Sequence, residues 1–287
     1  MNVLIYGAIN GSILILIAIG FSLVYGISRI ANFAHGAMYI LTGFIAWTLL
    51  TKLGLSMPLA FLCSIITSTL LGALLYRSVM VRVRGMEASE IIASFATALV
   101  AIEGLKKLGF LGAYGLPMIS YEALEFAGVT IDYQRLFAIG AGVVVVIFVY
   151  VFTHHTKAGL ALRGIAQDEQ AAMMLGIDSD RAATLSLALG SALVAVAAIV
   201  ILPRGNLYPE VGWKTLVEAV AVCIIGGLGS LQGTLIAGLM LGYIQVIASE
   251  YLGAQWQMLV LFLSILLVLI FRPSGLFGKQ KMLEERV

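Results

Sequence analysis

The side chains that could perform chemistry in this sequence are few, and their spacing keeps most of them apart. The chain of 287 residues has three histidines and two cysteines. His154 and His155 are adjacent and therefore point apart on a helix, while Cys63 and Cys223 each lie in an apolar stretch, where a free cysteine behaves as a small buried hydrophobe. Because a metal site needs several ligands that converge on one point, the spacing predicts neither a metal site nor a catalytic residue.

Asn32 and His35 are the polar pair that the spacing brings together. They lie three residues apart in the string N-F-A-H-G, at the start of an apolar stretch, so a helix would place them on one face. Hydrogen-bonding side chains at this position serve either as a functional site or as a structural cap of the helix. The sequence leaves both interpretations open.

Glu103 and Glu218 are the ionisable residues that we expect at membrane depth. A charge there is costly and usually faces a partner or a water-filled cavity. Lys106 and Lys107 lie about one helical turn from Glu103, so a salt bridge with either of them is favoured at that position. Lys214 lies one turn before Glu218, so for Glu218 a contact with a partner or cavity and an external ion pair are both open.

The segment 154–181 is a long polar connection with a helical composition. Its Ala, Leu, Met and Gln residues favour helix, Asp168 could cap a short helix, and Gly176 could end it. A short amphipathic helix parallel to the membrane is suited to docking a cytoplasmic partner. An ordinary interfacial helix is the alternative.

Motifs for nucleotide hydrolysis and nucleophilic catalysis are missing from the sequence. It contains no GxxxxGK[ST] phosphate loop, no GxSxG and no HExxH. The nearest string, which begins at Gly275 and runs to Gln280, has neither the spacing nor the final hydroxyl of a phosphate loop. We therefore expect that this chain does not hydrolyse ATP by itself and is not an enzyme.

The elements that position these residues are apolar helices. Hydrophobic residues make up 61% of the chain and charged residues 11%, whereas soluble domains carry about 25% charged residues. A bilayer-spanning helix needs roughly 20 apolar residues. Seven stretches without Asp, Glu, Lys or Arg reach that length: 3–28, 30–51, 53–76, 136–156, 182–203, 219–249 and 251–271. With a further helix at 88–110, the sequence predicts an all-α polytopic membrane protein of about eight to nine spans, and nucleic-acid binding has no support.

Glycines divide the longest apolar stretch. As one helix, 219–249 would be about 46 Å long, well beyond the roughly 30 Å hydrocarbon core. The string Gly226-Gly-Leu-Gly-Ser230 favours a bend, so we expect two segments that meet at 226–230, and no matching break is evident in the first half. Small-residue pairs such as Gly7 with Gly11 and Gly238 with Gly242 predict packing seams within one bundle.

The basic residues predict an orientation. If the spans alternate, eleven fall on one side, which the positive-inside rule makes cytoplasmic, and six on the other. The N-terminus would then be external, with cytoplasmic loops near 80–87 and 154–181 and a cytoplasmic tail from 272. The first group is Arg29, Arg77, Arg82, Arg84, Lys157, Arg163, Arg181, Arg272, Lys279, Lys281 and Arg286, and the second is Lys52, Lys106, Lys107, Arg135, Arg204 and Lys214.

Three blocks of sequence together resemble one family, the permease subunits of bacterial branched-chain amino acid ABC importers of the LivH type, which also includes urea and short-amide permeases. The blocks extend over nearly the whole chain. They are Gly20-Phe-Ser-Leu-Val-Tyr-Gly26 with Asn32-Phe-Ala-His-Gly36; Gly159-Leu-Ala-Leu-Arg163 through Gln167, Ala171, Ala172 and Leu175-Gly176-Ile177; and Gly226-Gly-Leu-Gly-Ser230 through Gly233 to Arg272-Pro-Ser-Gly-Leu-Phe-Gly278.

The resemblance implies a division of labour among several subunits. A single membrane domain, 1–287, would pair with a second permease subunit in a heterodimer, with two cytoplasmic ATPases that use ATP and Mg, and with a periplasmic solute-binding protein. This chain itself would bind no cofactor. The second block would be the coupling segment, with Gly159, Arg163, Asp168, Glu169, Ala171, Ala172, Leu175 and Gly176 at the ATPase. Candidates for the translocation path are Asn32, His35, Gly226, Gly227, Gly229 and Glu218.

Two departures from the family pattern bear on substrate and partner. Ala37 follows N-F-A-H-G where the family commonly has an acidic residue, and Gln167-Asp168-Glu169 replaces the usual Gln-Asn-Arg. The resemblance implies transport of branched-chain or other neutral amino acids across the bacterial inner membrane. A urea or short-amide permease is the alternative within the family. A secondary transporter is the alternative outside it, and would show ionisable or unwound-helix sites at the midplane.

Overall fold

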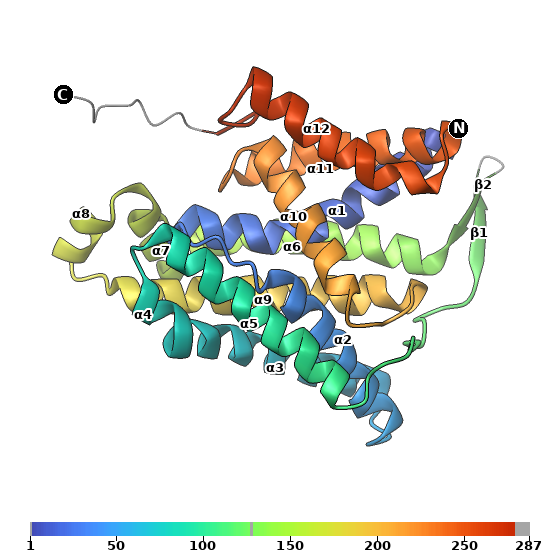
Figure 1. Cartoon of the computed structure of the whole chain (residues 1–287), viewed down its shortest axis with the longest axis horizontal. Helices are drawn as coiled ribbons and strands as arrows, with labels where there is room; N and C mark the ends of the chain where they lie inside the picture. Colours follow the sequence, from blue (N-terminus) through green and yellow to red (C-terminus); the bar gives the residue numbers. More distant parts are fainter. Residues whose placement is uncertain (1, 127–128, 279–287) are drawn as a thin grey trace.

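The computed structural model describes residues 2–126 and 129–278, and helices dominate it (Figure 1). The helices are α1 (Asn2–Ser28), α2 (His35–Thr51), α3 (Met57–Leu75), α4 (Val81–Val83), α5 (Glu87–Lys107), α6 (Tyr133–His155), α7 (Lys157–Gln167), α8 (Glu169–Met174), α9 (Ser179–Ile201), α10 (Val211–Gly226), α11 (Leu231–Tyr251) and α12 (Gln257–Phe271). A π-helical turn, η1 (Tyr76–Met80), joins α3 to α4, and two 3₁₀ turns are η2 (Leu202–Arg204) and η3 (Ala254–Trp256). The strands are β1 (Ala123–Phe126) and β2 (Val129–Asp132).

Seven helical segments within the described residues are long and apolar enough to cross a membrane. They comprise α1, α3 with its extension to Val83, α5, α6, α9 with η2, α11, and α12 with η3. Two shorter helices, α2 of 17 residues and α10 of 16, complete the bundle. The predicted all-α polytopic class is therefore confirmed, and eight to nine spans approximates seven long helices with two short ones.

Helices α1 and α9 form the centre of the bundle. They are the most buried of the long apolar helices, and α1 packs against α11, α9 and α10. Glycines allow the closest approach, because a Cβ built on Gly11 would lie 2.9 Å from Leu239 Cα, and one on Gly242 would meet the Gly11 backbone. The prediction that these glycines form close packing contacts between helices of one bundle is confirmed.

Helix α2 begins deep beside α1 instead of at the end of the bundle. Its first residue, His35, donates from Nε2 to the Ile17 carbonyl oxygen at 2.9 Å, and Ile17 lies near the middle of α1. The chain thus leaves α1 at Ser28 and returns through the non-helical residues 29–34 before α2 starts. The sequence shows no evident break in the first half that matches the glycine break, but the structure has one between α1 and α2. No glycine marks this break, and Arg29 adopts φ 58° at its start.

The predicted glycine break in the second half is confirmed. Helix α10 ends at Gly226 and α11 starts at Leu231. Gly227 has φ 100° and Gly229 has φ 78°, which are left-handed conformations that side-chain-bearing residues rarely adopt. The Ser230 hydroxyl then caps α11 by accepting a hydrogen bond from Gly233 N at 3.1 Å.

A β-hairpin, which we did not predict, follows α5. Strands β1 and β2 pair antiparallel, with Ala123 opposite Asp132, and the hairpin lies beside the N-terminal end of α1 in Figure 1. The Tyr6 hydroxyl donates to the Thr130 carbonyl oxygen at 2.8 Å. Each strand has four residues, so the apolar alternation is too short to stand out beside the long helices.

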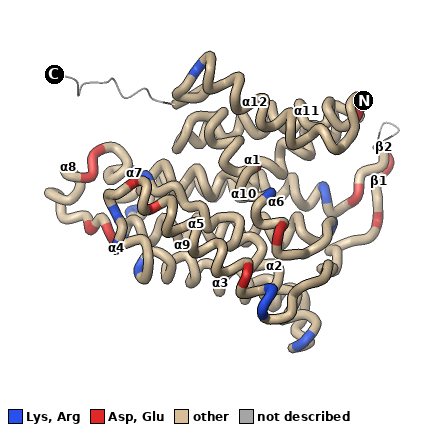
Figure 2. The backbone as a smooth tube through the Cα atoms, in the orientation of Figure 1, with Lys and Arg blue, Asp and Glu red and all other residues tan. Residues whose placement is uncertain are grey.

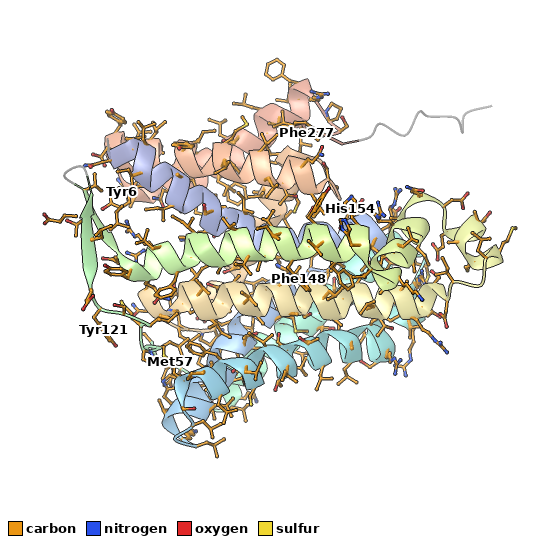
Figure 3. The ribbon with its side chains drawn as sticks, turned by 180° about the vertical axis from the view of Figure 1, so that it is seen from behind. Tyr6, Met57, Tyr121, Phe148, His154 and Phe277 are labelled. Atoms are coloured by element: carbon orange, nitrogen blue, oxygen red, sulfur yellow. The ribbon has the colours of Figure 1, made fainter. Side chains whose placement is uncertain are left out.

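Charged residues gather at the two ends of the bundle (Figure 2). Tyr6 and Tyr121 mark one end, which we call the hairpin end, and His154 and Phe277 mark the other, the coupling end (Figure 3). Arg135 and Arg204 both contact Asp132 at the hairpin end, whereas Arg84 contacts Glu169 and Asp180 at the coupling end. For these arginines the separation follows the predicted grouping. Lys279, Lys281 and Arg286 lie outside the described residues.

Candidate functional site

The coupling segment is attached to the bundle by a tight turn between α6 and α7. The Thr156 hydroxyl caps α7 by accepting a hydrogen bond from Gly159 N at 2.9 Å. A Cβ on Gly159 would lie 2.6 Å from Thr153 Cα and collide with the Phe152 carbonyl oxygen. Gly159 therefore has a packing role, since only a residue without a side chain lets α7 fold back on α6.

Asp168 divides the coupling segment into two helices. Its extended backbone ends α7, and its side chain caps α8 by accepting from Ala171 N at 3.0 Å. Gly176, with φ 83°, follows the end of α8, and the Ile177 N–H there donates to the Ala172 carbonyl oxygen at 3.1 Å. The predicted cap at Asp168 and stop at Gly176 are confirmed, but the segment holds two short helices where we expected one.

The apolar residues predicted to face the ATPase do not share one surface. Ala172 is only 4% exposed, and its Cβ lies near Gly164 of α7, so it joins α8 to α7 inside the protein. Ala171 is exposed, and Leu175 is 83% exposed. Met174, 88% exposed, was not among the predicted residues. The exposed apolar surface of α8 and its C-cap thus includes Ala171, Met173, Met174 and Leu175.

Glu169 is bound within the chain. Arg84 Nη2 donates to Glu169 Oε1 at 2.6 Å, and Arg84 Nη1 donates to Asp180 Oδ1 at 2.6 Å. The Ser179 hydroxyl also donates to Glu169 at 2.5 Å. Partial burial lowers the pKa of the Arg84 guanidinium, but the hydrogen bond to Asp180 and the nearby negative charges outweigh it, so the pKa is raised. A permanently charged arginine therefore ties α8 to the turn before α5.

Arg84 was missed as a functional candidate because sequence reasoning counted it only as a basic loop residue. Its partners come from three separate parts of the chain, including Tyr76, whose hydroxyl donates to Asp180 Oδ1 at 2.6 Å. Tyr76 begins the π-helical turn η1, a distortion that is frequent at functional sites. No periodicity in the sequence signals that turn.

A cavity of about 330 Å³ brings the three sequence blocks together at the coupling end. Tyr25 and Gly26 line it from α1, Arg163 from α7, and Gly229 from the glycine break. Arg163 is only partly exposed, and its Nε has no hydrogen-bond partner within the described residues. The structure therefore places Arg163 against the break and not on the outer face of the coupling segment.

The glycine break supports close backbone packing. A Cβ on Gly226 would lie 2.5 Å from Gly233 C, and one on Gly229 would lie 2.7 Å from Gly26 Cα. The segment after α12 packs on the same break, because Leu276 N donates to the Ile225 carbonyl at 2.8 Å and Phe277 N to the Gly226 carbonyl at 2.9 Å. The first two glycines of the third block, Gly226 and Gly227, thus meet its final residues, and Gly229 meets the first block.

Asn32 and His35 are buried and bonded to the chain itself. Asn32 Oδ1 accepts from Ala34 N at 3.1 Å, and the His35 ring meets the Phe21 ring edge to face at 5.8 Å between centroids. Ala37 is also buried. Of the two interpretations left open by the sequence, the contacts match the structural one, since both side chains fix the start of α2 beside α1.

Both glutamates that we expected at membrane depth have a lysine nearby. Lys106 Nζ lies 2.9 Å from Glu103 Oε1 and 3.0 Å from Glu210 Oε1, which confirms the predicted salt bridge at Glu103. Lys214 Nζ lies 3.8 Å from Glu218 Oε1, and the Glu218 side chain is 14% exposed. The Glu218 side chain is thus largely buried but still partly accessible, and it lies apart from the coupling-end cavity.

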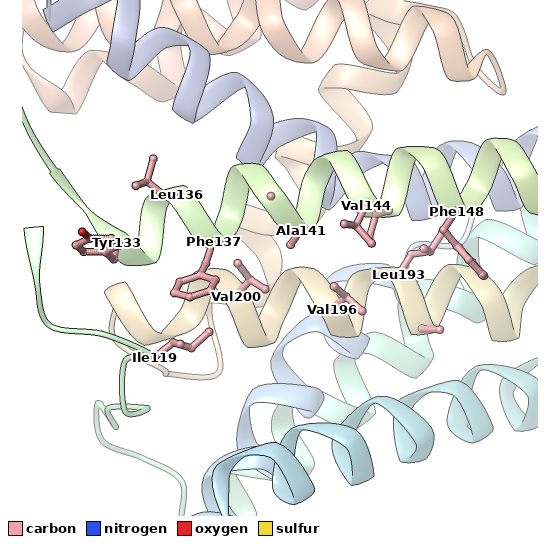
Figure 4. Close-up of a pocket in the computed structure, with 13 residues that line it drawn as sticks. Ile119, Tyr133, Leu136, Phe137, Ala141, Val144, Phe148, Leu193, Val196 and Val200 are labelled. Carbon is pink, nitrogen blue, oxygen red and sulfur yellow. The ribbon is translucent and has the colours of Figure 1, made fainter. Parts of the chain in front are cut away.

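An apolar groove of about 800 Å³ runs between α6 and α9 (Figure 4). Phe137, Val144 and Phe148 line it from α6, and Val196 and Val200 from α9. Its walls are almost entirely hydrocarbon, so they offer a polar solute nothing to replace lost hydration. Among the described residues, no group of three or more His, Cys, Asp or Glu side chains is arranged to hold a metal ion.

The described residues form an all-α polytopic membrane protein with a capped helical segment at one end and broken helices in both halves. Residues 3–269 match the family model described as the branched-chain amino acid transport system permease component. The chain belongs to this family of ABC permease subunits and is a multi-pass membrane protein. As a permease component it is not itself an enzyme.

Individual relatives align with this chain over almost its full length. The high-affinity branched-chain amino acid transport permease BraD of Pseudomonas aeruginosa is 30% identical, over 96% of this chain and 95% of BraD. LivH of Salmonella typhimurium, which carries the same description, is 27% identical over 95% of this chain and 94% of LivH. The solved structure of PsaBC from Streptococcus pneumoniae, in complex with a Fab, has a TM-score of 0.54 at 14% identity, over 96% of this chain and 94% of the other. That likeness concerns the fold alone.

Proposed function

We propose that this chain, as one membrane domain of residues 1–287, translocates branched-chain or other neutral amino acids inward across the bacterial inner membrane. ATP would be hydrolysed by two partner ATPases, which would also hold the Mg, and a periplasmic binding protein would deliver the solute. A second, non-identical permease subunit would complete the path. The names of the full-length relatives support the substrate class.

The observation that carries the coupling role is the projecting surface of α8. Ala171, Met174 and Leu175 are exposed beyond the end of the bundle, although all three are apolar or small. Exposure of apolar side chains on a helix that is capped at both ends costs free energy in water. Such a surface is typical of a contact with another protein. The coupling end would accordingly be cytoplasmic and the hairpin end, with the N-terminus, external.

The cavity beside Arg163 supports a route for coupling. It touches α7, the end of α1 and the glycine break, so a displacement of α7 by the ATPase would press on the break directly. Alternating access through broken helices needs no charge on the path itself. Asn32, His35, Gly226 and Gly227 would then take part by packing, and Glu218 is the candidate with a carboxylate.

Reconstitution tests this function. The complex would be isolated through a tag on this chain, placed in liposomes with its binding protein, and assayed for uptake of labelled leucine. We expect uptake only with ATP inside. Uptake driven by an ion gradient without ATP would indicate a secondary transporter, and ATP-dependent uptake of urea or acetamide but not leucine would indicate the other branch of the family.

A further inference from the structure

A small polar cavity lies at the hairpin end, opposite the coupling segment. Its volume is about 240 Å³, and it is an open hollow lined by residues of α1, the start of α6, the turn after α9, the end of α11 and the start of α12. Figure 1 shows the N-terminus of α1 and the hairpin at this end. The polar residues that line it are Asn10, Arg135, Arg204, Ser249, Glu250 and Gln257.

One side of the cavity carries an excess positive charge. Arg204 Nη2 lies 3.0 Å from Asp132 Oδ2, and Arg135 Nε lies 3.7 Å from the same oxygen. Two guanidinium groups therefore share one carboxylate. Arg135 Nε is buried without a hydrogen-bond partner among the described residues, and its guanidinium carbon is held 4.5 Å from the centre of the Tyr6 ring. This side is complementary to a carboxylate, which guanidinium groups bind well.

The other charged group of the cavity is negative. Glu250, on the last turn of α11, forms no ion pair within residues 2–126 and 129–278. Ser249 beside it supplies a hydroxyl, and the Asn10 amide is oriented by donating from Nδ2 to Gln245 Oε1 at 2.8 Å. Such groups accept hydrogen bonds from an ammonium.

The remaining wall consists of the apolar side chains of Ile9, Ile13 and Val246 together with Tyr6. The volume of about 240 Å³ falls below the roughly 300–1,000 Å³ of pockets for drug-sized ligands, so the ligand must be small. We propose that this cavity binds a free zwitterionic amino acid, with its carboxylate at Arg135 and Arg204, its ammonium at Glu250, and an aliphatic side chain against the apolar wall.

The proposal deepens the proposed function, on which its role in transport rests, because it places a recognition site on the permease itself. Selectivity would then be applied twice, once by the binding protein and once at the external end of the permease. A flat ionic contact with the binding protein is the competing use of these arginines. It would not need the concave shape or the apolar wall.

Protection from chemical labelling tests the site. Ser249→Cys would be made in a chain with Cys63→Ala and Cys223→Ala, and the intact complex in nanodiscs would be treated with an impermeant maleimide without ATP. Labelling of this chain would be timed with leucine, with leucinamide, which lacks the carboxylate, and with 4-methylpentanoate, which lacks the ammonium. Tyr251→Cys is the control, since Tyr251 is 76% exposed and does not line the cavity.

We expect leucine at ten times its Kd to slow the labelling of Ser249→Cys about tenfold by mass action, and neither analogue to do so at that concentration. Adding Arg135→Gln should abolish protection by leucine. Adding Glu250→Gln should weaken protection by leucine and remove the discrimination against 4-methylpentanoate. The labelling of Tyr251→Cys should not change.

The proposal is overturned if leucine does not protect Ser249→Cys, if both analogues protect as well as leucine, or if only the binding protein protects. ATP-dependent leucine uptake by the same complex in liposomes is measured in parallel. Uptake without protection contradicts the cavity site and leaves the proposed function intact, whereas absence of leucine uptake contradicts the proposed function itself.

Discussion

Arg84 Nη2 lies 2.6 Å from Glu169 Oε1, and this one contact links the turn before α5 to the first residue of α8. The two residues are 85 positions apart in sequence. Because the other arm of the same guanidinium holds Asp180 at the start of α9, one side chain joins α8, the turn before α5 and the start of α9. The charged residue that we expected on the ATPase-facing surface is thus also part of an internal clamp.

Removing this clamp should uncouple the permease. Arg84→Gln loses charge-assisted hydrogen bonds worth about 1–3 kcal/mol in total at a partly exposed site. We expect the complex to assemble, with ATP hydrolysis that no longer responds to solute and with reduced uptake. Arg82→Gln is the matched control, because within the described residues the Arg82 side chain bonds only to the Ser78 carbonyl, one turn before it. Equal effects of the two substitutions would contradict a specific role for Arg84.

The exposed face of α8 should be required for ATPase binding. Ala171→Glu adds a charge to a surface that we place in an interface, where desolvation costs about 2 kcal/mol or more, or about thirtyfold in affinity. Co-purification of the ATPase should fall while the permease stays in the membrane. Ala254→Glu is the control, because it makes the same change on an exposed residue at the hairpin end. It should leave co-purification of the ATPase unchanged. Normal ATPase recovery with Ala171→Glu would leave α8 an ordinary interfacial helix.

The orientation is measurable with two single cysteines. Met174→Cys lies on α8 and Tyr121→Cys near the hairpin, and the native residues are 88% and 79% exposed. In intact cells, an impermeant reagent should label Tyr121→Cys and spare Met174→Cys until the membrane is opened. The reverse pattern would invert the topology. Ser179 is unsuitable as a reporter, because it is buried and bonded to Glu169.

Gly227→Leu should impair folding as well as transport. A Cβ at this position would lie 2.7 Å from Gly278 Cα, and φ 100° is strained for leucine. Gly54→Leu is the control, since Gly54 has φ 64° but nothing within 4 Å of a built Cβ. Strain alone costs about 1–2 kcal/mol, and overpacking adds about 1–3 kcal/mol. Thermal melting of the purified complexes should therefore show a much larger loss for Gly227→Leu, and equal losses would mean that the close approach is unimportant.

Much of the fold could be predicted because lipid imposes a simple rule. A stretch without charges that is long enough to span must be helical, since backbone groups have no other partner in hydrocarbon. The glycine break at 226–230 was predictable on the same grounds, because the apolar stretch 219–249 is too long to cross the hydrocarbon core as one helix. The first break was not, because residues 29–34 contain no glycine and their backbone is satisfied from a distance, as when Phe33 N donates to Ser94 Oγ at 3.1 Å.

The candidate site was predictable only in part. Caps act within a few residues, so Asp168 and Gly176 could be assigned from local sequence. Which face of a short helix is exposed depends on the elements packed against it. The burial of Ala172 against α7 and the binding of Glu169 by Arg84 therefore could not be predicted from the sequence. The cavity at Arg135 and Glu250 joins residues of five elements, none of which carries a motif.

The hydrogen bonds at the glycine break have a consequence for biosynthesis. The Ile225 and Gly226 carbonyls receive their partners from Leu276 and Phe277, which the ribosome makes some fifty residues later. Until then these two carbonyl oxygens at the end of α10 lack their partners. Each unpaired carbonyl costs several kcal/mol if it is exposed to hydrocarbon. The segment after α12 therefore latches the end of α10, and a chain that stops before Leu276 would leave both carbonyls without these partners.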